Sequence, residues 1–326
     1  MRPAGPVMRT FSPLSVILIF DQNPRLGYRS EVPMDVQGEL GAAIAASLDD
    51  LLVALDLRPL GADRFALEPT TSSTPGRVFG GQLLAQAVVG AAATVPDKEI
   101  HSLHAAFVKA GTPGAAVELA VDRVRDGRSM ATRRVALSED GAVLLVAIAS
   151  FGEHRPEPDV AVSPVAATAP ADMPLLQDWA AAAPNGRQWI ESPPAIEVRL
   201  PESLSFLTGA SASSPRAHWM RLPRDIGESH ALNAALLCYA SDFFLMDMLF
   251  RLHPDELGPG RANGFSLDHS IWFHRPVRFD AWHLHTQEAA ALVGDRGLAH
   301  GKIHGADGRL VASVAQEVLL RVGSAQ

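Results

Sequence analysis

The sequence predicts an α+β fold made of two tandem copies of one unit. Two stretches, 79–94 and 229–251, are apolar on nearly every side and contain no proline, which is typical of helices buried all round. Each is followed by four runs with the composition of β-strands. In both halves an Asp-Gly pair, a strong signal for a tight hairpin turn, precedes the last run. The order of elements is therefore the same in the two halves.

The spacing of the two halves also agrees. Phe107 and Asp140 are 33 residues apart, and Phe273 and Asp307 are 34 residues apart. Identity between the halves is low, but order and spacing indicate a duplicated unit in which an antiparallel sheet wraps a long helix, as layer packing allows. The hot-dog fold is such a unit, so we expect a double hot-dog.

The elements of the first half follow from periodicity and turn signals. A helical stripe of apolar residues covers 41–57, and the 79–94 helix opens with two glycines. Composition makes 71–76 a loop. The expected strands are 64–69, 101–108, 116–124, 129–138 and 142–151.

The second half begins after a stretch rich in Pro and Ala. Its central helix has Ser229 as an expected N-cap and His253-Pro254 as a stop. A loop is expected at 258–264. The expected strands are 218–222, 265–273, 282–290, 298–304 and 310–321. The predicted domains are a disordered extension (1–40), a first hot-dog unit (41–154), a linker with short elements (155–215) and a second unit (216–322).

Bulk composition excludes several classes of protein. With 47% hydrophobic and 20% charged residues, the chain is typical of a soluble globular protein, and no transmembrane span is expected. The net charge of −8 argues against non-specific nucleic-acid binding. The single cysteine, Cys238, lies on the buried helix and is expected to be a core residue. We therefore expect a cytoplasmic protein.

Polar residues on apolar faces indicate where chemistry can occur. Asp242 lies within the second buried helix, where a carboxylate must be paired, hydrogen-bonded or functional. Gln316 interrupts the apolar face of the last strand, and Ser266 opens the strand after the helix. The pattern alone leaves a structural role open for Asp242 and keeps Asp268 as an alternative acid. The first half has no such set, since Ala149 or Ser150 matches Gln316.

Other groups of polar residues are weaker candidates. Histidines on the last strands (His269, His274, His283, His285, His300, His304) match no common zinc spacing, so we expect no metal and take strand histidines to lie on the surface. Asp268 and His269 are adjacent on a strand and point to opposite faces. Five arginines (Arg123, Arg125, Arg128, Arg133, Arg134) could bind an anion, but a solvated face is the favoured interpretation.

Several motifs together resemble the acyl-CoA thioesterase II family. They are Val78-Phe-Gly-Gly-Gln82, His101-Ser-Leu-His104, Arg125-Asp-Gly-Arg128, Ser241-Asp242, Ser266-Leu-Asp-His-Ser-Ile-Trp-Phe-His-Arg-Pro276 and Val314-Ala-Gln-Glu317. The resemblance runs from about Leu51 to Arg321 and implies a double hot-dog enzyme that hydrolyses acyl-CoA. By this resemblance the catalytic residues are Asp242, Ser266 and Gln316, with Asp242 preferred to Asp268.

The resemblance implies a mechanism without a cofactor. Asp242, Ser266 and Gln316 would hold a water for attack on the thioester. The segment formed by Phe79, Gly80, Gly81 and Gln82 would bind substrate, and Gly80-Gly81 could place helix N-terminal backbone N–H groups at the oxyanion. A dimer of double hot-dogs, with no nucleic-acid or membrane partner, is expected. The alternatives are a hot-dog enoyl-CoA hydratase, for which His104 and His269 are candidates, and a non-catalytic acyl-CoA-binding protein.

Overall fold

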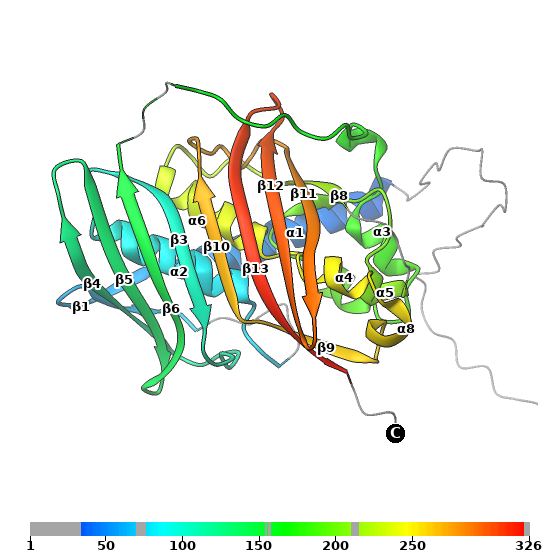
Figure 1. Cartoon of the computed structure of the whole chain (residues 1–326), viewed down its shortest axis with the longest axis horizontal. Helices are drawn as coiled ribbons and strands as arrows, with labels where there is room; N and C mark the ends of the chain where they lie inside the picture. The colour runs from blue at the N-terminus through cyan, green and yellow to red at the C-terminus, as the bar shows by residue number, and fades with distance from the viewer. Residues whose placement is uncertain (1–33, 70–75, 154, 156–157, 210–214, 323–326) are drawn as a thin grey trace, which may run out of the picture.

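One large antiparallel sheet forms the front of the molecule, and helices α1 (Met34–Ala54), α2 (Gly80–Ala93) and α6 (His230–Ser241) lie behind it (Figure 1). The computed structural model describes residues 34–69, 76–153, 155, 158–209 and 215–322. The order of hydrogen-bonded strands is β1-β2-β4-β5-β6-β3-β10-β13-β12-β11-β8-β7, and β9 also pairs with β13. Each half of the chain thus supplies one contiguous half of the sheet, as two hot-dog units in tandem require.

The first half contains the elements that the sequence predicts, with one strand more. They are α1 (Met34–Ala54), β1 (Leu57–Gly61), β2 (Arg64–Leu67), α2 (Gly80–Ala93), β3 (Glu99–Phe107), β4 (Val117–Asp126), β5 (Met130–Glu139) and β6 (Ala142–Gly152). Asp140 and Gly141 have φ angles of 48° and 79°, which confirms the expected hairpin. Helix α1 starts before residue 41, and 1–33 lie outside the described residues.

The second half follows a run of short elements. These are η1 (Pro170–Asp172), α3 (Leu176–Ala181), α4 (Arg187–Glu191), β7 (Glu197–Arg199) and α5 (Ser205–Thr208). The second unit then comprises β8 (Arg216–Arg221), α6 (His230–Ser241), α7 (Asp247–Phe250), α8 (Pro254–Leu257), β9 (Ala262–Ser266), β10 (Asp268–Phe273), β11 (His283–Val293), β12 (Arg296–Gly305) and β13 (Leu310–Val322). The expected N-cap is confirmed, because Ser229 accepts a hydrogen bond from the backbone of Leu232.

The two halves meet through strands β3 and β10 and through helices α2 and α6. His104 lies opposite Ser270 across the strand junction. The beginning of α2 packs against the end of α6 so closely that a Cβ on Gly81 would lie 2.4 Å from the carbonyl oxygen of Tyr239. Glycine is therefore required at this crossing, since any side chain would force the helices apart. The two helices run antiparallel, with the end of each near the start of the other.

The prediction of one continuous helix over 229–251 is wrong. Helix α6 ends at Ser241, and Phe244, with a φ of 68°, separates it from α7. The carbonyl groups released by the break are bound from a distance, because the Gln287 amide donates to the Phe243 oxygen at 2.7 Å. Arg216 pairs with buried Asp247 at 2.5 Å and holds the start of α7. Asp242 thus stands at the end of a helix rather than in its middle.

A helix that spans a membrane needs about 20 consecutive, mostly apolar residues, a requirement that applies equally to the helices described above. None of those in the described part of the chain combines the length and apolar character that crossing a bilayer requires.

Candidate active site

A cavity of about 380 Å³ lies where the first turn of α2 meets the end of α6. Asp242, Ser266 and Gln316 all line it, although they come from three separate parts of the chain. Phe79 and Gly80 line it as well. Gly81 and Gln82 are buried in the first turn of α2 and are not part of the lining. The structure therefore brings the three predicted catalytic residues together in one place.

The Asp242 carboxylate is buried at the end of α6 with few partners. The residue is 8% exposed, and its Oδ1 has no hydrogen-bond donor among the described residues. Burial raises the pKa of Asp242 to about 6, while hydrogen bonds from the Gln316 side chain and the Gly81 backbone act in the opposite direction. A carboxylate with this pKa is deprotonated at neutral pH and basic enough to accept a proton from water.

The two glycines at the start of α2 allow this carboxylate to come close. A Cβ on Gly80 would lie 2.8 Å from Asp242 Oδ2 and 3.1 Å from the ring of Phe107. The amide of Gly81 is already bound to the Asp242 carboxylate. The first-turn amide of Gln82 bonds to the carbonyl oxygen of Phe79. The N–H of Gly80 is thus the donor of this turn that both borders the cavity and lacks an intrahelical partner.

Gln316 and Ser266 form a hydrogen-bonded pair on neighbouring strands. The Gln316 side chain is on the inner face of β13 and is 1% exposed. Its Nε2 donates to Ser266 Oγ at 2.5 Å. Ser266 ends β9, where the chain bends at Leu267 before β10 begins. This bend places the hydroxyl of Ser266 at the cavity.

His269 also belongs to this cluster, although the sequence indicated it only as a candidate for a metal site or for the hydratase alternative. It is fully buried, with Nδ1 3.2 Å from Gln316 Oε1 and Nε2 2.9 Å from Ser241 Oγ. Burial lowers its pKa to about 4, so the imidazole is neutral at neutral pH, and the 3.8 Å separation from Asp242 Oδ1 is not an ion pair. The expectation that Asp268 cannot pair with it holds, since Asp268 binds the backbone N–H of Glu317 instead. Inner-face periodicity on β10 was the signal that could have identified His269.

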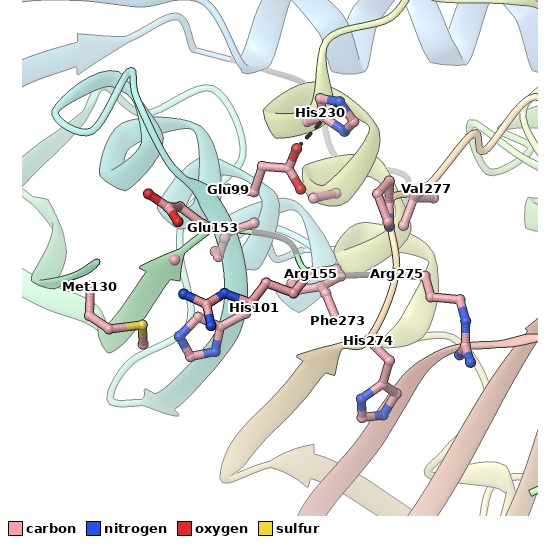
Figure 2. Close-up of a pocket in the computed structure, with 14 residues that line it drawn as sticks. Glu99, His101, Met130, Glu153, Arg155, His230, Phe273, His274, Arg275 and Val277 are labelled. Atoms are coloured by element: carbon pink, nitrogen blue, oxygen red, sulfur yellow. Dashed lines mark ion pairs between the residues drawn. The ribbon is translucent and has the colours of Figure 1, made fainter. Parts of the chain in front are cut away.

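A second cavity, of about 220 Å³, lies at the opposite end of the helix pair (Figure 2). It is lined by Ile100 and His101 of β3, His230 of α6, and Phe273 and His274 at the end of β10. These are the elements that match, in the other half, those around Asp242. Its lining contains two carboxylates, Glu99 and Glu153. Glu153 is exposed, and Glu99 is partly exposed and lies 3.5 Å from His230.

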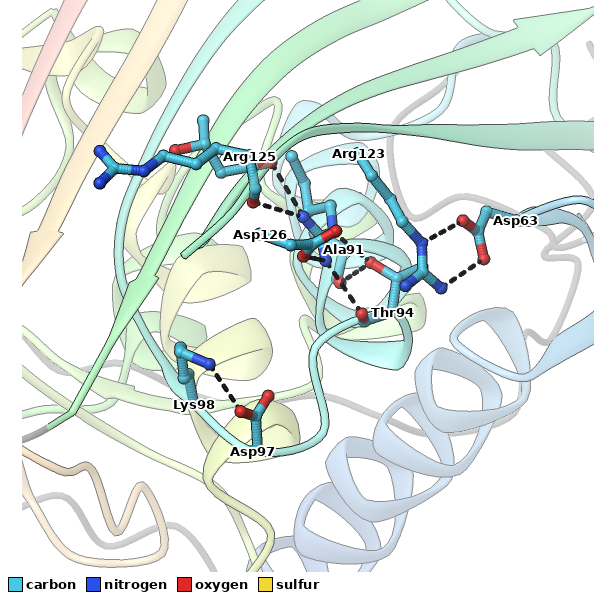
Figure 3. Close-up of polar contacts among 10 residues, drawn as sticks. Asp63, Ala91, Thr94, Asp97, Lys98, Arg123, Arg125 and Asp126 are labelled. Carbon is cyan, nitrogen blue, oxygen red and sulfur yellow. Dashed lines mark hydrogen bonds and ion pairs between the residues drawn. The ribbon is translucent and has the colours of Figure 1, made fainter. Parts of the chain in front are cut away.

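The side chain of Arg133 binds the end of α2 at Thr94. Figure 3 labels Thr94, together with Arg125 and Asp126 of the same set of contacts. Arg133 is 1% exposed, and its guanidinium donates to the hydroxyl and the carbonyl oxygen of Thr94, the C-cap of α2. It also binds the carbonyl oxygen of Arg125 and the carboxylate of Asp126. The expectation of a solvated arginine face is therefore wrong for Arg133, because its charge satisfies the free carbonyl groups of a helix end. The other four arginines are exposed.

The remaining histidines correct a further expectation. His269, His283, His285 and His304 are all buried, so the prediction that strand histidines lie on the surface is wrong for them. His269, His283 and His285 belong to the inner face of the sheet, whose polar members a local pattern does not separate from surface residues. His304 is instead covered by the segment that precedes the second unit, where its Nε2 donates to the carbonyl oxygen of Val162. Among the described residues, no three His, Cys, Asp or Glu side chains are grouped as metal ligands. His104 is exposed and bonds to Ser270, away from the cavity.

Comparisons with known proteins identify the family of the chain. A family model described as the acyl-CoA thioesterase N-terminal domain matches residues 69–152, and the C-terminal domain model matches 166–320. The chain is 32% identical over 306 residues to acyl-coenzyme A thioesterase 8 of Mus musculus, covering 88% of this chain and 92% of the mouse protein. It is 32% identical over 266 residues to acyl-CoA thioesterase 2 of Haemophilus influenzae, covering 75% and 88% of the two chains.

A solved structure supports the fold. The crystal structure of an acyl-CoA thioesterase II from Mycobacterium marinum matches with a TM-score of 0.69 and 30% identity. The match covers 86% of this chain and 99% of the other. The double hot-dog architecture expected from the sequence is thereby confirmed.

Proposed function

Because the chain belongs to the acyl-CoA thioesterase II family, we propose that it hydrolyses acyl-CoA thioesters to a fatty acid and CoA with Asp242 as the base. The observation that carries this proposal is the position of Asp242. Its buried carboxylate has a raised pKa and an oxygen with no donor in the described part of the chain, and it lines a cavity together with Ser266 and Gln316.

The proposed reaction uses water as the nucleophile. Asp242 accepts a proton as the water oxygen attacks the carbonyl carbon, and Ser266 and Gln316 orient that water. The negative charge that develops on the carbonyl oxygen is stabilised by the N–H of Gly80 at the positive end of α2. When the intermediate collapses, the carbon–sulfur bond breaks. The CoA thiolate leaves and takes the proton back from Asp242, which returns the carboxylate to its starting state.

The cavity has the properties that the two parts of the substrate require. Apolar side chains cover much of its wall: Val78, Leu83, Phe107, Val108, Met246, Phe265 and Leu267. These suit an acyl chain, because burying apolar surface stabilises the complex. Two cations, Arg77 and Lys109, also border the cavity, and Lys109 is exposed. We propose that these two side chains interact with the phosphate groups of CoA.

The experiment that tests this function follows thiol release with a chromogenic thiol reagent. Short-, medium- and long-chain acyl-CoAs are supplied to the wild type and to Asp242→Asn. We expect the wild type to release thiol and the variant to lose about 10²- to 10⁴-fold in kcat, the usual contribution of a general base. Asp178→Asn is the matched control, because burial raises the pKa of that carboxyl too, yet it lies in α3 and caps the helix through Leu175.

Other outcomes of this experiment would contradict the proposal. Full activity in a folded Asp242→Asn variant would remove Asp242 from the mechanism. If no acyl-CoA releases thiol, absorbance of an enoyl-CoA is followed to detect a hydratase. Acyl-CoA binding without either reaction would identify a binding protein.

Two further features are proposed on physical grounds alone. We expect a homodimer of double hot-dogs, which the sedimentation velocity of the purified chain would measure. A cytoplasmic location also stays a prediction.

A further inference from the structure

We propose that His269 is a positioning residue that fixes the amide orientation of Gln316, and thereby the hydrogen bond that Gln316 gives to Asp242. The inference rests on the proposed function and adds to the reaction a residue that does not touch the substrate. His269 is fully buried and is absent from the lining of the cavity. Its effect on catalysis must therefore act through a neighbour.

The geometry connects His269 to the reacting groups through one amide. His269 Nδ1 lies 3.2 Å from Gln316 Oε1, at the opposite end of that amide from the nitrogen. The nitrogen donates to Ser266 Oγ at 2.5 Å, and a hydrogen bond from the Gln316 side chain lowers the pKa of Asp242. A primary amide has two donor hydrogens and can serve both partners at once.

An amide can also turn by half a rotation, and His269 prevents this. In the turned state the oxygen of Gln316 would face the Asp242 carboxylate, and two acceptors would oppose each other in a buried site. A proton on His269 Nδ1 makes the ring a donor to Gln316 Oε1, so the observed orientation gains a hydrogen bond that the turned state loses. A free glutamine side chain would not have this bias.

Ser241 contacts the other ring nitrogen. Its Oγ donates to the carbonyl oxygen of Cys238 at 2.8 Å and lies 2.9 Å from His269 Nε2. The hydroxyl has one hydrogen, so it holds the imidazole proton on Nδ1, facing Gln316, when that hydrogen turns from Cys238 to Nε2. The opposite arrangement would place the acceptor side of the ring toward Gln316 and turn its oxygen to Asp242. The negative charge of Asp242 therefore selects the first arrangement.

Of His269, Asp242 and the described titratable groups that face them, Asp242 is the one whose pKa, about 6, lies near the neutral range. His269 is faced by Asp242 and by His285 of β11, and its neighbour on β3 is Ala105. Burial lowers the pKa of His285 to about 3. Cys238 and Tyr239 of α6 interact with Asp242, but burial raises the pKa of each far above its usual value. A shift of the acid limb of activity near pH 6 thus reports on Asp242.

The first half of the chain has apolar residues at the positions that match His269 and Gln316. Leu103 of β3 pairs with Ala149 of β6, and this is the position that His269 and Gln316 occupy in the second half. Both first-half residues are fully buried and apolar. A hot-dog unit thus folds without a histidine here, and the histidine is present in the half that holds Gln316. This distribution is expected if the histidine positions the Gln316 amide and is not needed to form the sheet.

His269→Phe tests the inference, because phenylalanine keeps a flat ring and removes both nitrogens. We expect kcat for acyl-CoA hydrolysis to fall about 10- to 100-fold, the value of one hydrogen bond to a charged network, with KM within about twofold of the wild type. The acid limb of kcat/KM should also move to higher pH, because Asp242 loses a bond that favours its charged form. Ser241→Ala should give a smaller change in the same direction.

A double-mutant cycle separates positioning from a general structural effect. If His269 acts through Gln316, His269→Phe should cost less than about twofold further in a Gln316→Ala background. The matched control is His283→Phe, another buried strand histidine, which bonds to the Ala281 carbonyl and should leave kcat unchanged. If His269→Phe does not fold, Ser241→Ala and its own cycle with Gln316→Ala take its place.

The outcomes keep this inference apart from the proposed function. A wild type that releases no thiol from any acyl-CoA overturns both. An active wild type overturns the inference alone in either of two cases: folded His269→Phe keeps the kcat and acid limb of the wild type, or its loss is as large in the Gln316→Ala background.

Discussion

The two ends of the α2–α6 helix pair differ in how the polar groups at the helix terminus are hydrogen-bonded. At the end of α6, the Asp242 carboxylate is buried, and one of its oxygens has no protein donor among the described residues. At the end of α2, the guanidinium of Arg133 binds both the hydroxyl and the carbonyl oxygen of Thr94, the residue labelled in Figure 3. One terminus leaves a charge with unused bonding capacity, and the other is satisfied. The end of α2 is thus bonded within the protein, whereas the end of α6 keeps a carboxylate oxygen available at the cavity.

The strands show the same difference. Around Asp242 the inner positions are the polar Ser266, His269 and Gln316. At the matching register positions of the first half, Leu103 and Ala149 pack in the core. The comparison teaches that the hot-dog unit needs neither set to form its sheet. The polar set is expected to lower stability, as catalytic groups commonly do.

The largest effect on stability is expected at the end of α2, where Arg133 binds Thr94. Arg133→Met removes a buried cation and leaves the Thr94 and Arg125 carbonyl oxygens without their donor. We expect a loss of about 2–4 kcal/mol in the free energy of unfolding, measured by urea denaturation. Activity per folded molecule should stay within about twofold. A large loss of turnover in the folded variant would mean that the end of α2 contributes to catalysis. This would contradict a difference in role between the two helix ends.

Replacing Gln316 by its first-half counterpart should reduce the turnover that we attribute to Asp242. Gln316→Ala introduces the side chain that β6 has at the matching position and removes the bonds to Ser266 and Asp242. We expect kcat to fall about 10- to 100-fold, measured by thiol release. Gln86→Leu, which removes a buried amide from α2 that bonds to Ala54, is the matched control and should retain kcat. Equal losses in the two variants would show that the effect is one of folding.

A smaller effect should appear as a gain in the free energy of unfolding. The folded-state pKa of Asp242, about 6, exceeds its unfolded value of 3.8, so the folded protein binds this proton more tightly. The contribution of Asp242 to stability is therefore most favourable below pH 4 and is lost as pH rises through 6. We expect Asp242→Asn, which removes this cost, to be more stable than the wild type by about 1–3 kcal/mol at pH 8. A less stable variant at pH 8 would contradict a desolvated carboxylate.

Much of this architecture could be predicted from the sequence because its signals are local. Period-2 alternation identified the inner face of the last strand, and Gln316 was visible as its polar member. The Asp-Gly turns, with Asp140-Gly141 in the expected conformation, fixed the ends of the hairpins. The resemblance to a family then selected Asp242 over Asp268, a choice that spacing left open.

The features that could not be predicted depend on distant partners. The break after Ser241 is held by Gln287 and Arg216, which are 44 and 31 residues away from their partners in the chain. Arg133 looked like part of a solvated face because the helix end that it closes lies 39 residues away. His269 was separated from Gln316 by 47 residues, and its place in the cluster depends on how β10 pairs with β13. In each case a side chain satisfies a group that no local pattern connects to it.

The measurement that tests the central claim most directly is the pH dependence of kcat/KM for acyl-CoA hydrolysis by the wild type and Asp242→Asn. The account predicts that wild-type kcat/KM falls about tenfold per pH unit below a pKa of about 6, as Asp242 takes up its proton. This limb should be absent from the residual activity of Asp242→Asn. A wild-type profile that stays flat between about pH 5 and 8, or a variant that keeps the same limb, would contradict Asp242 as the base.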